Sequence, residues 1–579
     1  MSERAVTAFV PRLALWSAVV TVIIAARPDP ALSLMLMALA GVVTIVSDAR
    51  FPVERRLEEA GLPSREAWVP LAMLPLMVAL DLIDAGRIDA VVAEHGPVIA
   101  FILAIALVSE GLRQCGFFHY LAYRLTRHAG GSTTRLTLSL FLLSSLLAYV
   151  TSNDMVILTM TPIVLSVAHQ ARIPNAKLLL LSQFVAANTL SMGLLIGSPT
   201  NLILARAVGI DFVEYLVLMA VPALLALMGT LVVITAINGA VARVGDTNRV
   251  VRWLIGTWRY SPDYRPPRFT DHGAFTGQMA RWVAIFLVSV ILLAFGAATS
   301  TGLLRAATAI AALGLASLFW DRRRSDVPAD RPFIRGALRI LPVGIVCFGL
   351  SYFVIADAIA DTPFVRDRVS EFVAVPEAAQ TPVRSWTPIL TSGVLVNTMN
   401  DLPAAALLGK ALTRVDDDFA TPIDLVVVIQ GLVVGLNTAA YVTPVGALAG
   451  IIWFDVLRKD RERREVETPA GDDRPFVVVT PARRDLIVYG AATFLTMTVL
   501  LGLTNFGFGA LAGWMNGLGS GQPWFQSVSH VLWTVAGLVT AIAIVMRFWR
   551  VLHDNGVDPS HLANPRAVFT RMRVPASRR

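Results

Sequence analysis

Long apolar runs alternate with short polar segments along most of this chain. An apolar helix needs about 20 residues to cross the hydrocarbon core of a bilayer, with a range of about 17–25. By that measure the sequence predicts twelve membrane-spanning helices, over about 12–27, 31–47, 67–83, 91–112, 176–209, 212–238, 282–299, 304–320, 336–360, 422–457, 484–505 and 527–548.

Two further apolar stretches, 136–169 and 386–412, carry a polar break in mid-course. The first break reads Thr151-Ser152-Asn153-Asp154, and the second reads Asn397-Thr398-Met399-Asn400-Asp401-Leu402-Pro403. We interpret both stretches as helical hairpins that enter the membrane and turn back. Cytoplasmic loops hold an excess of Lys and Arg, and only re-entrant hairpins place the basic loops, including Arg322-Arg323-Arg324, on the cytoplasmic side. Both chain termini are then predicted to be cytoplasmic.

The same order of elements occurs twice, as a polar-tipped hairpin followed by a long helix with a Ser/Thr-Pro break. Ser152 precedes Ser198 by 46 residues, and Asn397 precedes Thr443 by 46 residues. The topology gives the two units opposite membrane orientations. Interrupted segments in corresponding positions of two inverted halves mark the midplane binding site of many secondary transporters. Non-helical backbone is tolerated at that depth only in protein or beside a watery cavity.

The predicted fold is therefore an all-α integral membrane protein, with about 12 transmembrane helices plus two re-entrant helical hairpins in two inverted-topology repeats. We divide the chain into N-terminal accessory helices (1–66), a first repeat with hairpin 136–169 (67–238), a cytoplasmic loop (239–281), a second repeat with hairpin 386–412 (282–505), and a last helix with a basic cytoplasmic tail (506–579).

Composition agrees with this pattern. Of 579 residues, 55% are hydrophobic and 16% charged, against about 25% charged in soluble proteins. The two cysteines, Cys115 and Cys347, lie far apart in largely apolar sequence, which argues against a disulfide framework and against structural zinc. The net charge is +8, and the basic residues lie almost wholly between the apolar runs. This position is typical of the excess of Lys and Arg in cytoplasmic loops, and it argues against nucleic-acid binding. No P-loop, Rossmann fingerprint or H-E-x-x-H motif is present, so we expect neither ATP hydrolysis nor an enzyme.

Two acids, Asp154 and Asp401, stand at the hairpin tips beside Asn153 and Asn400. A carboxylate near the bilayer centre costs at least about 2.5–3.5 kcal/mol, so we expect each one to face a cavity and a partner. The functional interpretation is that these four residues bind Na⁺ or take up a proton, because oxygen-only ligation suits a hard cation. The alternative is that each aspartate caps the second half-helix of its hairpin. No cofactor is expected beyond Na⁺ or H⁺ as the coupling ion.

Hydroxyl and amide side chains near the breaks are the candidate substrate or second-cation contacts. They are Ser152, Ser198, Thr200, Asn201, Asn397, Asn437, Thr438 and Thr443. The alternative is that they only satisfy the broken backbone, as Ser and Thr commonly do in membrane helices. Arg206 follows the first break, and its favoured interpretation is that it snorkels to the interface, with neutralisation of an anionic substrate as the alternative.

The motifs resemble the ion transporter superfamily, which includes arsenical pump membrane proteins, citrate and dicarboxylate transporters, and a class of sodium/proton antiporters. The matching motifs are Glu110-Gly111-Leu112-Arg113, Thr151-Ser152-Asn153-Asp154, Thr161-Pro162-Ile163-Val164-Leu165, Asn397-Thr398-Met399-Asn400-Asp401 and Thr443-Pro444-Val445-Gly446-Ala447-Leu448-Ala449. They are most similar to the arsenical pump branch. Asp401 departs from it, because arsenical pumps usually carry a second asparagine there. The extra acid argues against a neutral arsenite cargo and favours cation coupling at two sites.

The expectation is a secondary carrier in a bacterial inner membrane that moves a small inorganic or carboxylate anion by alternating access, coupled to Na⁺ or H⁺. Arsenite-type efflux is the nearest named alternative. The resemblance implies a rocking or elevator-like movement between a carrying unit and a scaffold. A sodium/proton antiporter stays open as a rival, as does a channel or membrane subunit driven by a separate ATPase. The expected partners are a small-molecule or ion substrate and the lipid bilayer, with no nucleic acid, and a homodimer is left open.

Overall fold

The computed structural model describes most of the chain from the first helix to residue 518. The described residues are 3–26, 30–46, 65–117, 120–121, 123–124, 131–242, 275–296, 300–324, 343–363, 365, 367, 377–413, 422–444, 446–447, 449–450, 453–454, 456–458, 460–461 and 478–518. The predicted span 527–548, the tail after it and most of the 239–281 loop lie outside them.

The described residues form helices. The one pair of described residues that forms a β-bridge is Asn175 and Val479. The longer helices are α1 (Glu3–Ala26), α2 (Pro30–Val46), α4 (Arg65–Ala79), α5 (Ala85–Gln114), α7 (Thr133–Val150), α8 (Asn153–Gln170), α9 (Lys177–Thr189), α10 (Pro199–Ala207), α11 (Phe212–Ala242), α13 (Gly277–Gly296), α14 (Ser300–Arg324), α16 (Val343–Ala360), α18 (Glu377–Met399), α19 (Asp401–Thr413), α20 (Pro422–Thr438) and α22 (Arg483–Leu518).

Five of these helices are long and apolar enough to cross a membrane by length and composition, namely Ala85–Gln114, Thr133–Val150, Phe212–Ile237, Thr301–Asp321 and Arg483–Asn505. Shorter apolar helices accompany them. Large apolar side chains such as Phe295 and Val213, 87% and 64% exposed, face outward, where lipid would cover them. The chain is thus an all-α membrane protein. The number of spans and the inverted relation of the repeats stay predictions.

The two polar-tipped stretches each form two helices separated by a short break. Helix α7 ends at Val150, Ser152 is extended, and α8 begins at Asn153. Between α18 and α19 the break is Asn400 alone, with φ of +85°. Asparagine is among the few side chains that tolerate this left-handed region. Sequence and structure therefore place both turns at the same polar residues.

The first interrupted helix breaks earlier than its sequence indicates. Helix α9 ends at Thr189, and two short 3₁₀ turns, η1 (Leu190–Gly193) and η2 (Leu195–Gly197), lead to extended Ser198. Helix α10 then begins at Pro199, whose fixed φ suits the first helical position. Thr200 and Asn201, expected in the break, lie inside α10 instead. The second interrupted helix loses its regular course after Thr438, where α20 ends.

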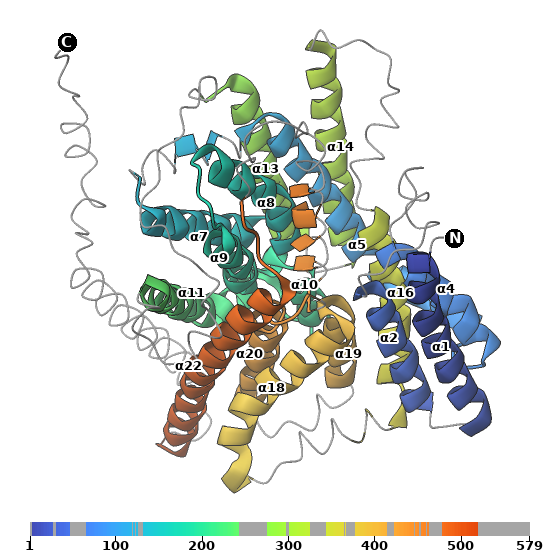
Figure 1. Ribbon diagram of the computed structural model, residues 1–579. Coiled ribbons are helices and arrows are strands. Elements are labelled where there is room, and N and C mark those ends of the chain that lie inside the picture. The colour runs from blue at the N-terminus through green and yellow to red at the C-terminus, as the bar shows by residue number, and fades with distance from the viewer. Residues whose placement is uncertain are drawn as a thin grey trace, which may run out of the picture.

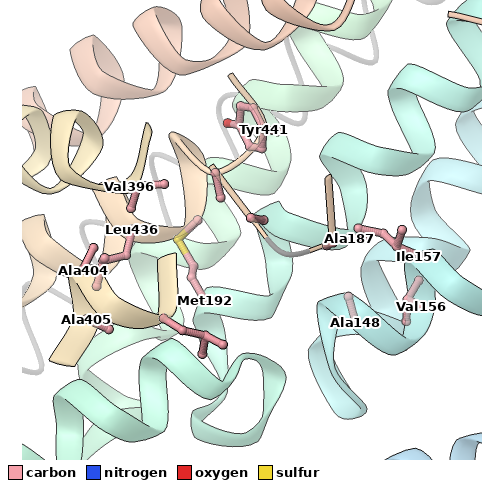
Figure 2. Packing of buried hydrophobic residues seen from close by; sticks show 14 of the residues in the cluster. Ala148, Val156, Ile157, Ala187, Met192, Val396, Ala404, Ala405, Leu436 and Tyr441 are labelled. Carbon is pink, nitrogen blue, oxygen red and sulfur yellow. The ribbon is translucent and has the colours of Figure 1, made fainter. Parts of the chain in front are cut away.

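Helices from both halves pack around these breaks (Figure 1). Helix α10 packs against α19 of the second hairpin, α18 lies along α20, and α9 packs against α7 and α8. Helices α5, α13 and α14 form a neighbouring group, and α16 joins α4 to α19. Buried apolar side chains such as Ile157, Met192 and Leu436 fill the space between them (Figure 2). The discontinuous segments thus lie inside protein, where their free backbone groups find partners.

Candidate functional site

The tip of the first hairpin is bonded to the helix that precedes the first break. Asn153 donates from Nδ2 to Oδ1 of Asn188 at 3.0 Å, and Asn188 donates to the backbone oxygen of Phe184 at 3.0 Å. Ser152 donates to Oδ1 of Asn153 at 3.4 Å. All three polar side chains are buried. These bonds fix the hairpin tip against α9.

Asn437 joins the two interrupted helices. Its Nδ2 donates to Oδ1 of Asn201 at 2.9 Å, and its Oδ1 accepts from Oγ of Ser191 at 3.3 Å. Asn201 in turn donates to the backbone oxygens of Ser191 and Leu194 at 2.8 and 3.1 Å. The side chain of Asn201 therefore satisfies the carbonyls that the first break sets free. The side-chain amide of Asn437 thus connects the second interrupted helix to Asn201 and Ser191 at the first break.

The second hairpin is bonded to the second break in a similar manner. Asn397 accepts at Oδ1 from Oγ1 of Thr443 at 2.7 Å and donates from Nδ2 to the backbone oxygen of Ala439 at 3.0 Å. Thr443 also accepts from the backbone amide of Gly446 at 3.2 Å. Asn397 and Thr443, which lie 46 positions apart, are therefore direct partners.

Asp154 is the acid at the tip of the first hairpin. It lies in the first turn of α8, is 7% exposed, and its Oδ1 has no hydrogen-bond partner within the described part of the chain. Together with Ser152 and Pro199 it lines a cavity of about 10 Å³, roughly the smallest space that holds one water. The backbone of Ala449, beyond the second break, lies near its carboxylate. A buried carboxylate beside the hydroxyl of Ser152 offers oxygen ligands only, which are the kind that a hard cation prefers.

Asp401 is held differently. Its Oδ1 accepts from the backbone amide of Leu402 at 3.0 Å, and Oδ1 of Asn400 accepts from the same amide at 3.4 Å. Both side chains are buried. These bonds satisfy a free amide at the start of α19, which is what the capping alternative requires. The structure thus separates two aspartates that look equivalent in sequence.

Three of the predicted contact residues bond mainly to their own segment. Ser198 and Thr200 bond to one another through their hydroxyls at 2.8 Å, and Thr438 donates to the backbone oxygen of Val434 at 2.7 Å. All three are buried. Their local bonds favour the interpretation that hydroxyls satisfy broken or neighbouring backbone.

Two residues of this polar centre, Asn188 and Ser191, are not among the predicted site residues. Both are buried polar side chains within an otherwise apolar span, and this exception is the signal that points to them. Among the described residues no group of three or more His, Cys, Asp or Glu side chains is placed to hold a metal ion.

A buried, discontinuous polar centre within an apolar helical fold is typical of membrane transporters. Comparison with known proteins gives the family. The chain belongs to the citrate transporter family, whose model matches residues 57–556. This is a family of transporters, with a small molecule or ion as substrate.

Individual relatives share between 22% and 27% sequence identity with this chain. The arsenical pump membrane protein of Escherichia coli is 25% identical over 367 residues, which cover 62% of this chain and 78% of the relative. A 46 kDa membrane protein of Mycobacterium leprae is 22% identical over 370 residues, with the same coverage of 62% and 78%. An uncharacterized transporter of Mycobacterium tuberculosis is 27% identical over 166 residues, which cover 29% of this chain and 35% of the relative.

Proposed function

We propose that this protein is a secondary carrier that moves a small inorganic or carboxylate anion by alternating access, coupled to a Na⁺ or H⁺ gradient. The observation that carries the proposal is the position of Asp154, a buried carboxylate with an unpartnered oxygen beside a cavity of about 10 Å³. The family description adds citrate to the candidate substrates, and the name of the E. coli relative adds an arsenical.

Proximity of the first hairpin to the segment beyond the second break supports alternating access. Asp154 belongs to the first hairpin, yet the backbone of Ala449 beyond the second break lies near its carboxylate. A cation bound at Asp154 would therefore change the charge that the second unit faces. Movement of one unit relative to the other would alter the ion's ligands. The ion would then bind the two conformations with different affinities, and this difference shifts the equilibrium between them.

The test is uptake by purified protein in vesicles that hold only an ion gradient and no nucleotide. We expect uphill accumulation of citrate or arsenite when a Na⁺ or pH gradient is imposed. Asp154→Asn is expected to abolish accumulation above equilibrium, because the amide can neither take up a proton nor offer a negative charge to a cation. Asp89→Asn, an exposed position on α5, is the matched control.

Each other outcome identifies a rival. Exchange of Na⁺ for H⁺ with no transport of citrate, of arsenite or of any anion would establish a sodium/proton antiporter and refute the carrier proposal. Uptake that never exceeds equilibrium, with or without a gradient, would indicate a channel or a subunit that needs an ATPase. Unchanged accumulation by Asp154→Asn would remove Asp154 from the coupling site.

A further inference from the structure

A second cavity, of about 350 Å³, lies between α5, α10, α16 and α19. None of its lining residues lines the cavity at Asp154. Its polar lining consists of Glu94, His95, Arg206, Asp357, Lys410 and Thr413. The volume is at the lower end of the range of about 300–1,000 Å³ found for small-molecule sites.

One wall of this cavity carries Asp357 and Lys410, which belong to an ion-pair network of two cations and two carboxylates. Arg87 donates from Nη1 to Asp357 at 2.7 Å and to Asp361 at 2.6 Å. Lys410 donates to Asp357 and lies 3.3 Å from Asp361. The four groups come from α5, α16 and α19, and their formal charges cancel. Since each carboxylate already has two cationic partners, this wall does not attract a further simple cation.

The other walls carry Glu94 and His95 on α5 and Arg206 on α10. The His95 ring stacks on Phe353 with 4.4 Å between ring centroids, which fixes its orientation. Glu94 lies close enough to Arg206 for the two charges to interact. Acidic and basic groups therefore face the same space from different helices, and their charges nearly balance. Such a lining complements a solute that carries both an anionic group and hydrogen-bond donors.

We propose that this cavity is a second binding site, for a small acid that also carries a hydroxyl or ammonium donor. The carboxylate of the acid binds Arg206 and Lys410, and its donor group binds Glu94. On the predicted topology, all the helix ends that form the cavity lie at the outer face of the membrane. The site is then a docking place at the outer mouth of the carrier, apart from the ion site at Asp154.

The test places a reporter at the rim of the cavity. Thr413 is exposed, so Thr413→Cys, in the full chain with Cys115 and Cys347 replaced by alanine, is modified by an uncharged thiol reagent. We expect L-malate or L-serine to slow modification several-fold, succinate to slow it less, and glycerol to have no effect. Protection by malate alone assigns a hydroxy acid, and protection by serine alone assigns an amino acid.

Variants separate the site from its alternatives. Arg206→Gln and Lys410→Gln are each expected to remove protection, whereas Arg305→Gln, at an exposed position of α14 outside the cavity, keeps it. Asp154→Asn also keeps it, so that loss of ion coupling and loss of this site are distinguishable. The proposal is overturned if neither malate nor serine protects the thiol introduced at position 413, if succinate protects as well as malate, or if both cavity variants keep full protection.

Discussion

Removing the side chain of Asn437 should loosen the contact between the two interrupted helices. Asn437→Ala leaves two groups without their partner: Oδ1 of Asn201, which accepts from Nδ2 of Asn437 at 2.9 Å, and the hydroxyl of Ser191, which donates to Oδ1 of Asn437 at 3.3 Å. Interhelical hydrogen bonds in membrane proteins contribute about 0.6 kcal/mol on average and at most about 1.7 kcal/mol. Two such bonds give an expected loss of about 1–3 kcal/mol.

The measurement is a double-mutant cycle of Asn437→Ala and Asn201→Ala, read as the free energy of unfolding in mild detergent. We expect a coupling energy of about 0.6–1.7 kcal/mol between the two positions. Thr496→Val is the control, because Thr496 is exposed on α22 and bonds only to its own helix, at the backbone oxygen of Ala492. Its expected effect is within about 0.5 kcal/mol.

The same variants test whether the contact serves transport. Asn437→Ala should lower the rate of gradient-driven uptake more than Thr496→Val, since a displaced second break no longer presents Ala449 to Asp154. If the effects of Asn437→Ala and Asn201→Ala add to within about 0.3 kcal/mol, the two amides do not act as a pair. The role assigned to Asn437 is then wrong.

Three further changes have defined outcomes. Gly197→Ala should lower the thermal midpoint and transport, because an added Cβ would overlap the backbone oxygen of Ser191, whereas Gly277→Ala, with open space around it, should leave both unchanged. Lys177→Met should cost about 3–5 kcal/mol of unfolding free energy by leaving its buried partner Asp485, 2.8 Å away, without its lysine; a small effect in chemical unfolding contradicts this. Thr443→Val should reduce uptake and Thr443→Ser preserve it, since only serine retains a hydroxyl for Asn397; equal uptake by both variants would exclude this hydrogen bond from transport.

The hairpin breaks could be predicted because backbone N–H and C=O groups within the membrane must find hydrogen-bond partners inside the protein. A run such as Thr151-Ser152-Asn153-Asp154 is poorly suited to the middle of a continuous apolar helix, and α7 and α8 do meet there. The start of the first break could not be predicted in the same way. The 3₁₀ turn begins at Leu190 in a stretch that reads as continuous helix, and its free carbonyls at Ser191 and Leu194 are satisfied by Asn201, several residues later.

Long-range partners were also beyond the reach of sequence alone. Asn201 and Asn437 are 236 positions apart, and no local pattern selects one amide among the many in the chain. The network of Arg87, Asp357 and Lys410 depends on the packing of three helices from distant segments. In the sequence each of these residues looks like an ordinary charge near the end of a span.

Two asparagines in corresponding places show how the structure departs from the symmetry of the predicted repeats. Asn188 lies near the end of α9 and bonds to Asn153 in the hairpin of its own unit. Asn437 lies near the end of α20 and bonds across to Asn201 in the other unit. The first break is therefore stabilised by both units, while the second hairpin is bonded to its own break through Asn397 and Thr443. Because the bonding differs between units, Asp154 and Asp401 need not share a function, and ion coupling is best sought at Asp154, whose carboxylate is within reach of both.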